Sequence, residues 1–209
     1  IVGADSDISD IDAGNEIVLG YGVTGKGSNK ATIGNADITD VYMASDSGAT
    51  VHTAGIQFPS SQAASGGANV LDDYEEGEHT VTGTDAGGGT FTLNSSYNKL
   101  TYTKIGRQVT VSGELALNDL SSTVSGELRF TLPFALLDHS TGGDRFLGVV
   151  QTRNVNHTAN AVSLVAKAVN ATQYFYIVEI TDDGIESSVT GAMCSTNDEV
   201  TVTLTYFTS

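Results

Sequence analysis

The chain has 209 residues and a formal net charge of −16 at pH 7, with 25 acidic side chains against 9 lysines and arginines. Glycine, threonine and serine make up a third of the chain, a composition that favours strands and turns over helices. So acidic a chain is repelled by nucleic-acid phosphates and by anionic lipid headgroups, which argues against binding to DNA or RNA. The longest apolar runs span only a few residues, so we expect no membrane insertion.

The first residues, Ile1 and Val2, are not preceded by a methionine, and no basic region followed by an apolar stretch appears. We therefore expect no secretory signal, and a chain that is part of a longer protein. Cys194 is the only cysteine, which excludes an internal disulfide and a multi-cysteine zinc site. Stability must then come from packing or from assembly.

A short internal repeat occupies the first segment, where residues 15–20 (NEIVLG) return in kind as residues 29–34 (NKATIG), 14 positions later. Each copy has an asparagine, a three-residue apolar or β-branched centre and a closing glycine, which predicts one short strand per repeat. Two such units are too few to bury their apolar face, and identical chains packed about an axis would supply the rest. We therefore expect a parallel homotrimer with a β-structured stalk over residues 1–58, including further strands within 41–58.

Composition changes after this segment. Residues 59–67 are small and polar, and residues 71–77 are strongly acidic. Such a stretch is typical of a junction between folded parts, so we expect a linker over residues 59–80.

From about residue 90 onward, apolar and polar residues alternate in several consecutive runs. The runs fall at residues 109–117, 127–132, 162–166, 174–180 and 200–206. For the fourth run, the row of Tyr174, Tyr176, Val178 and Ile180 is interpreted as the apolar face. Period-two alternation separated by turn residues indicates half-buried strands. We expect an all-β chain whose residues 81–209 form an antiparallel β-sandwich, or jelly roll.

Three segments resemble phage tail fibre and tailspike proteins. Residues 15–35 are similar to the glycine-punctuated stalk repeats of such fibres and to the heads of trimeric autotransporter adhesins. Residues 69–77 (NVLDDYEEG) resemble the linker before a fibre terminal domain. Residues 100–109, together with residues 130–134 (FTLPF), look like the first strands of that domain.

The resemblance implies a homotrimer at the tip of a fibre in the virion tail, joined to other tail proteins through a missing N-terminal part. It also implies host attachment by binding a bacterial surface polysaccharide, either capsule or lipopolysaccharide. Two other hypotheses stay open at this point. One is a tailspike-type capsule depolymerase, and the other is the head of a cellular trimeric adhesin.

The sequence offers little that predicts catalysis. The acids at residues 72–76 are adjacent, so they point apart instead of forming the carboxylate pair of a glycosidase. Residues 138–140 (DHS) contain the three residue types of a hydrolase triad, but triad members converge from separated segments. Acidic residues from Asp5 to Glu16 match some positions of a calcium loop, yet Asp10 stands where glycine is required. We therefore expect no enzyme, no metal and no cofactor.

Candidate ligand-binding residues are those that could hydrogen-bond sugar hydroxyls or stack on sugar rings. The richest polar segment is residues 151–158 (QTRNVNHT), and two tyrosines follow nearby in the sequence. Arginines in this region suit an acidic glycan, because charged hydrogen bonds to carboxylates are strong. The candidates are His139, Asp144, Arg145, Arg153, Asn154, Asn156, His157, Tyr174 and Tyr176.

Overall fold

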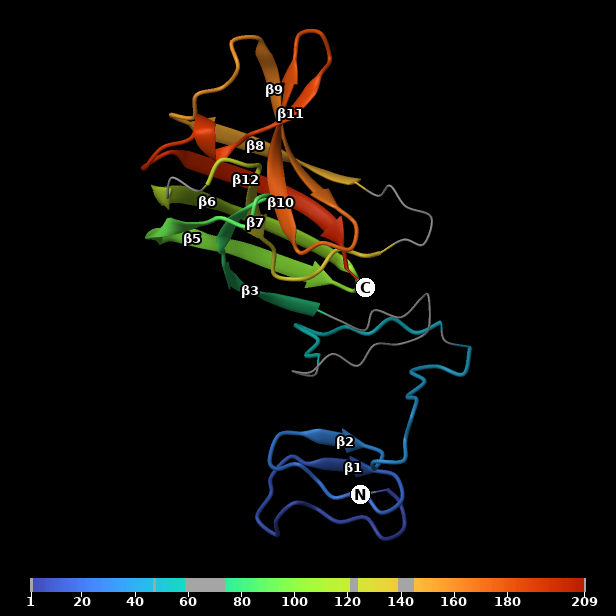
Figure 1. Ribbon diagram of the computed structural model, residues 1–209. Coiled ribbons are helices and arrows are strands. Elements are labelled where there is room, and N and C mark those ends of the chain that lie inside the picture. Colours follow the sequence, from blue (N-terminus) through green and yellow to red (C-terminus); the bar gives the residue numbers. More distant parts are fainter. Residues whose placement is uncertain (1, 47, 59–73, 121–123, 139–144, 209) are drawn as a thin grey trace. The chain divides into compact units, whose positions relative to one another are not determined.

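The computed structural model describes residues 2–46, 48–58, 74–120, 124–138 and 145–208, without the side chain of Arg145. The chain divides into two units, Ile1–Ile56 and Gln57–Ser209, and each is considered by itself (Figure 1). Apart from one short 3-10 helix, the regular elements of the described residues are strands, so the expectation of an all-β chain is confirmed. No described helix is long and apolar enough to cross a membrane.

The first unit contains a parallel pair of short strands, β1 (Ile17–Leu19) and β2 (Ala31–Ile33). Val18 lies opposite Thr32, so the register equals the 14-residue shift of the sequence repeat. The asparagines that open the two copies also meet, because Asn15 Nδ2 donates to Asn29 Oδ1 at 3.1 Å. Both have a positive φ, which asparagine tolerates better than most residues.

A third layer precedes the two repeats. The amide of Val2 donates to the carbonyl of Val18, and the amide of Asp7 donates to that of Val23, each at 2.9 Å. Val18 and Val23 are buried, whereas Ile17 is half-exposed. The three layers therefore stack through backbone hydrogen bonds around a very small apolar core.

The strands expected within residues 41–58 are not found in the described part of that stretch, so this expectation is wrong. Apolar side chains there, including Val41, Tyr42 and Val51, are exposed. The amide of Gly48 donates to Asp46 Oδ1 at 2.9 Å, which folds the chain into a local turn instead. Apolar residues alone do not make a strand where no neighbouring strand accepts its backbone hydrogen bonds.

The second unit is built of antiparallel strands. In chain order they are β3 (Tyr74–Thr80), β4 (Gly83–Asp85), β5 (Thr90–Ile105), β6 (Gln108–Leu120), β7 (Leu128–Thr131), β8 (Arg145–Arg153), β9 (Ala161–Val169), β10 (Tyr174–Thr181), β11 (Glu186–Ser188) and β12 (Glu199–Phe207), with the 3-10 helix η1 (Gly191–Met193) before β12. Each of the five alternating runs of the sequence coincides with a strand, namely β6, β7, β9, β10 or β12.

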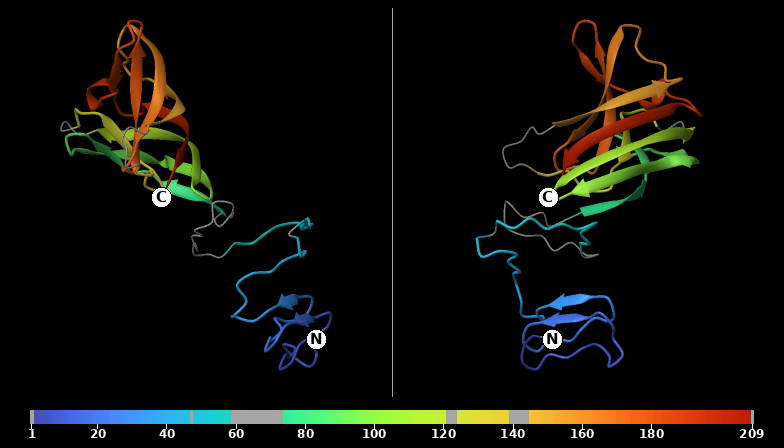
Figure 2. Two further views of the ribbon diagram at one scale, coloured as in Figure 1. Left: turned by 90° about the vertical axis from the view of Figure 1, so that its right-hand side faces the viewer. Right: turned by 180° about the vertical axis from the view of Figure 1, so that it is seen from behind.

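The sheet of this unit closes on itself. Its strand order is β10-β7-β4-β5-β6-β12-β8-β9, and β9 pairs back onto β10, which makes a barrel of eight strands. Strands β5, β6, β12 and β8 lie side by side along one wall (Figures 1 and 2). The expected sandwich of two separate sheets differs from this arrangement, because β9 uses both of its edges and leaves no gap between the sheets.

Two strands extend beyond the boundaries that the sequence indicates. Tyr74–Thr80, assigned to the linker, forms β3 and pairs with the second half of β5. It does so because β4 pairs only with Thr90 and Phe91 of that long strand and leaves the rest of its edge open. Strand β8 likewise includes Arg145 and Arg153, which the sequence places in loops.

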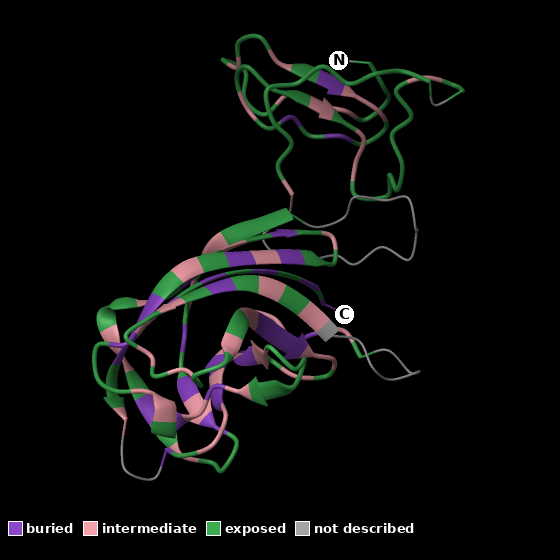
Figure 3. Cartoon of the chain, turned by 90° about the horizontal axis from the view of Figure 1, so that it is seen from above, coloured by how far each residue is buried: buried purple, intermediate pink, exposed green. Residues whose placement is uncertain are grey.

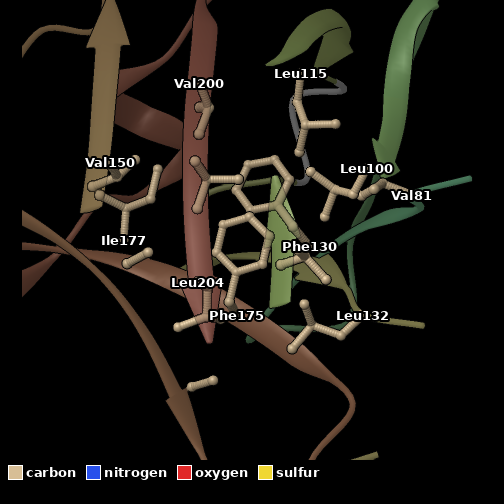
Figure 4. Packing of buried hydrophobic residues seen from close by; sticks show 14 of the residues in the cluster. Val81, Leu100, Leu115, Phe130, Leu132, Val150, Phe175, Ile177, Val200 and Leu204 are labelled. Atoms are coloured by element: carbon tan, nitrogen blue, oxygen red, sulfur yellow. The ribbon is translucent and has the colours of Figure 1, made fainter. Parts of the chain in front are cut away.

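The core fills the interior of the barrel, and burial alternates along the strands that line it (Figure 3). At its centre Phe130 stacks on Phe175, with ring centroids 5.1 Å apart, and Phe91 meets Phe130 edge-on at 5.5 Å. Leu100 and Leu204 pack around these rings from β5 and β12 (Figure 4). Aromatic pairs of this kind add to the stability that burial alone provides.

One buried carboxylate ties the β4–β5 turn to the segment before β7. Asp85 Oδ1 accepts hydrogen bonds from the amides of Gly87 at 3.0 Å and Gly89 at 2.6 Å. Its Oδ2 accepts from the amides of Ser125 at 3.1 Å and Gly126 at 3.0 Å. The Gly126 amide is the main cause that lowers the pKa of Asp85, and it and the other three amides outweigh the opposing effect of burial. The ionised form therefore holds the two segments together.

Truncation of the central ring tests the core. Phe130→Ala should reduce the free energy of unfolding by about 3–5 kcal/mol, because it removes a fully buried ring and leaves a cavity. Tyr97→Ala, at an exposed position of β5, is the matched control and should cost less than about 1 kcal/mol. Urea denaturation measures both, and similar losses would contradict this account of the core.

The pH dependence of stability tests the role of Asp85. Since its pKa is lower in the folded chain than in the unfolded chain, its contribution is complete at neutral pH and is lost as the pH falls through the folded-state pKa. Asp85→Asn should therefore be less stable than wild type at neutral pH, and the difference should shrink in acid. Urea unfolding of both proteins at a series of pH values measures this difference. A difference that stays constant with pH would contradict the role given to Asp85.

Candidate functional site

A notch opens in the barrel wall where β8 and β9 separate. Their ladder ends at the pair Val149 and Val165, after which β8 follows β12 and β9 follows β10. The notch forms a cavity of about 350 Å³. It is lined by Val150, Gln151, Thr152, His157, Ala161, Val162, Ser163 and Leu164.

The loop between these strands places His157 in the notch, and both ring nitrogens of His157 have partners. Nδ1 lies 2.5 Å from Oε1 of Glu179, on β10. Nε2 lies 2.6 Å from Oγ1 of Thr152, on β8. Three side chains from separate segments therefore form one continuous hydrogen-bonded chain.

Glu179 is fully buried and points to the barrel interior. Thr158 Oγ1 donates to its Oε2 at 2.7 Å. Burial by itself raises the pKa of Glu179, but the hydrogen bonds from Thr158 and His157 outweigh that effect and lower it. The carboxylate is therefore ionised and can only accept hydrogen bonds. In the neutral imidazole the proton then lies on Nδ1, and Nε2 accepts from the Thr152 hydroxyl.

The rest of the loop is held by backbone contacts. The amide of Asn156 donates to the carbonyl of Met193 at 2.9 Å. Asn154 has a φ of 67°, in the left-handed region that asparagine enters more readily than most residues. Nearby, burial is the main cause that raises the pKa of the Cys194 thiol to about 12, with smaller effects from Asp198 and Glu179. Cys194 is thus a protonated thiol and not a nucleophile.

A second cavity, of about 220 Å³, adjoins the notch and shares Gln151 and Thr152 with it. Its other lining residues are Glu114, Arg153, Glu199 and Thr201. Arg153 forms an ion pair with Glu199, and 68% of the arginine side chain is exposed. This cavity is therefore polar and contains both signs of charge.

The two candidate tyrosines lie elsewhere, on the outward row of β10. The Arg129 guanidinium stands 4.6 Å from the centre of the Tyr174 ring. Tyr176 lines a shallow cavity of about 140 Å³ together with Lys167 and Glu186, which are themselves ion-paired. Because Glu179 belongs to the inward row, the tyrosines and the His157 chain occupy opposite faces of the same strand.

The structure thus brings together part of the predicted site. His157 lines the notch and Arg153 lines the adjoining cavity, whereas Asn154 and Asn156 belong to the same loop but line neither, and Tyr174 and Tyr176 lie on the outward row of β10. His139 and Asp144 lie outside the described residues. Arg145 begins β8, and its side chain is not described.

Sequence reasoning missed Thr152 as a central residue, and it missed Glu179 altogether. The expected apolar face of β10, Tyr174 through Ile180 in alternation, is the outward row, and that expectation is wrong. Phe175, Ile177 and Glu179 point inward. Both rows are largely apolar, so periodicity cannot decide between them. The sequence did contain one indication of a buried functional group, because Glu179 falls in the same alternating row as Phe175 and Ile177.

Among the described residues, no three His, Cys, Asp or Glu side chains are grouped so that they could hold a metal ion. The polar groups that line the notch and the adjoining cavity are hydroxyls, the Gln151 amide, the His157 imidazole, the Arg153 guanidinium and the carboxylates of Glu114 and Glu199. Such a set can bind hydroxyl-rich or acidic ligands and can move a proton between the imidazole and a hydroxyl.

Comparison with known proteins shows a likeness in fold. No protein-family model and no curated protein matches the chain. Among solved structures, the chain is similar to the Dettilon tailspike protein (gp208), with a TM-score of 0.51 and 14% sequence identity. The match covers 64% of this chain and 24% of the tailspike chain. At this identity the likeness concerns the fold, which is one that a phage tail protein also uses.

The His157–Glu179 contact can be tested by stability. His157→Ala should reduce the free energy of unfolding by roughly 1.5–3 kcal/mol, because it removes a hydrogen bond from a buried carboxylate. Asn156→Ala is the matched control in the same loop, since the contact of Asn156 with Met193 uses its backbone amide, and it should change stability by less than about 0.5 kcal/mol. Equal effects in chemical denaturation would show that the histidine does not anchor the loop.

Proposed function

We propose that this chain is the receptor-binding part of a phage tail and attaches the virion to a polysaccharide on the bacterial surface. The observation that carries the proposal is the notch between β8 and β9, on a fold similar to part of a phage tailspike protein. A volume of about 350 Å³ lies in the range of small-ligand sites, roughly 300–1,000 Å³. Polar side chains beside an apolar floor suit a saccharide, which has hydroxyl edges and apolar faces.

Arg153 supports an acidic glycan as the ligand. Its guanidinium bonds Glu199 through Nη2, and the group carries further N–H donors that can reach a ligand carboxylate. Glu114 and Glu199 share the cavity with Arg153, so the proposed attraction rests on individual N–H donors of the guanidinium and not on a net positive charge. Gln151 lies on the same strand and lines both cavities, and its amide suits sugar hydroxyls.

Assembly of three chains is the second part of the proposal. The first unit buries Val18 and Val23 but leaves Ile17 and Ile33 half-exposed on its two short strands. Such stacked layers need neighbours to cover their apolar side chains. Identical chains around a three-fold axis would supply them, as expected from the sequence repeat.

Binding can be tested with a glycan array, followed by affinity measurements on the glycan that binds best. Arg153→Ala should weaken binding by about tenfold or more, because a charged hydrogen bond contributes roughly 1.5–3 kcal/mol. Lys99→Ala is the matched control, since Lys99 forms a similarly exposed ion pair with Glu78, and it should leave affinity unchanged.

Other results of the same assay would revise or overturn the proposal. If Arg153→Ala binds normally and Tyr174→Ala does not, the glycan lies on the outward face of β10 beside Arg129. New reducing ends after incubation with capsule would favour the depolymerase alternative. Failure of wild-type protein to bind any capsule or lipopolysaccharide preparation would overturn glycan recognition.

The oligomeric state is tested by analytical ultracentrifugation of the full chain. We expect a mass about three times that of one chain. Replacement of Ile17 and Ile33 by threonine should shift the equilibrium toward monomer, because it removes exposed apolar surface without breaking the backbone ladder of β1 and β2. A stable wild-type monomer at micromolar concentration would contradict the trimer.

A further inference from the structure

We propose that the notch is also a hydrolytic site for acyl esters, with Thr152 as nucleophile, His157 as general base and Glu179 as the positioning residue. The three side chains are linked in the order carboxylate, imidazole, hydroxyl. The Glu179–His157 contact is 2.5 Å and the His157–Thr152 contact is 2.6 Å. Acyl-transfer enzymes on unrelated folds use this same order, which is recognised by geometry and not by spacing in the sequence.

The position of each member of the chain suits its proposed role. Glu179 is fully buried, and it is also held by the Thr158 hydroxyl, so it orients His157 without facing solvent. In the neutral imidazole with its proton on Nδ1, toward the carboxylate, Nε2 is the acceptor for the Thr152 hydroxyl. Thr152 lines both cavities, so it borders the space that a ligand would fill. A threonine hydroxyl activated by a neighbouring base is a known type of covalent nucleophile.

The cavity suits a short acyl group and can stabilise a developing oxyanion. Val150, Val162 and Leu164 supply an apolar lining for the acyl chain. The Gln151 amide and the Ser163 hydroxyl line the same cavity and are donors of the kind that oxyanion sites use. In addition, the facing edges of β8 and β9 do not pair with each other beyond Val149 and Val165, so backbone groups border the cavity.

The reaction consumes one water molecule and proceeds in two halves. Thr152 Oγ1 attacks the ester carbonyl carbon while its proton passes to Nε2 of His157. The tetrahedral intermediate then expels the alcohol, which takes that proton and leaves the acyl group on Thr152. Water attacks the acyl-threonine, again giving a proton to Nε2, and this proton returns to Oγ1 as the carboxylic acid departs. The net change is ester plus water to alcohol plus acid.

The class of substrate follows from the two cavities together. An ester in the notch would place its acyl group on the apolar lining and its alcohol part toward the polar cavity of Arg153 and Glu114. An O-acylated saccharide has this composition. That identification of the alcohol part rests on the proposed glycan binding, whereas hydrolysis of a small ester does not.

Ester hydrolysis by the full chain is the direct test, with 4-nitrophenyl acetate as the probe. Wild-type protein should hydrolyse it at least about 10²-fold faster than Thr152→Val, which keeps the shape of the side chain and removes the hydroxyl. Thr152→Ser restores a hydroxyl and should restore turnover. Thr203→Val, on the outer face of β12 where Thr203 bonds Ser112, is the matched control and should behave as wild type.

A second readout separates catalysis from a purely structural hydrogen bond. A fluorophosphonate should label wild type and Thr152→Ser at position 152, as mapped by mass spectrometry, and should leave Thr152→Val unlabelled. Equal hydrolysis by wild type and a folded Thr152→Val, or no label on residue 152, would overturn the site. Ester hydrolysis without binding to any glycan would overturn the proposed receptor role alone, and glycan binding without ester hydrolysis would overturn the inference alone.

Discussion

The pairing of β9 with two neighbours determines the shape of the second unit. By bonding β8 along one part and β10 along its length, β9 closes the sheet into a barrel and leaves no free edge there. Toward the end of β8, however, β8 pairs with β12 while the facing part of β9 pairs with β10. The two strands separate after Val149 and Val165, and the notch is the space that results. The candidate site is therefore a consequence of how the barrel closes.

Two buried carboxylates show how this barrel accommodates charge. Asp85 is satisfied by four backbone amides, so it needs no cation and links a turn to a distant segment. The shortest hydrogen bonds of Glu179 come instead from the side chains of His157 and Thr158, with a longer contact of 3.4 Å from the Thr158 amide. Amides fix a structure permanently, whereas an imidazole and a hydroxyl can exchange protons. Because of this difference in partners, we interpret Asp85 as structural and Glu179 as part of the proposed reactive group.

The strongly acidic surface and the local chemistry of the notch act at different ranges. Net charge repels anions over about 10 Å at ordinary ionic strength, so it selects which partners approach the molecule. Inside the notch, contacts at hydrogen-bond distance determine which ligand binds. In our proposal, Arg153 binds an anionic group of the ligand, and His157 accepts a proton from the Thr152 hydroxyl. Attachment and ester hydrolysis would then be two uses of one surface, since a ligand held by the polar cavity presents its acyl groups to Thr152.

The sequence by itself determined the all-β class and the 14-residue register of β1 and β2. It also determined where five strands lie, namely β6, β7, β9, β10 and β12. It could do so because period-two alternation and local repeats are properties of neighbouring residues. It also directed attention to residues 151–158. It could not choose the inward row of β10, since Tyr176 and Ile177 are both apolar, and it could not show β3, whose pairing depends on the open edge of a distant strand. The union of Thr152, His157 and Glu179 was decided only by tertiary structure. These residues come from two strands and a loop, and hydrogen bonds among them exist only once the barrel has closed.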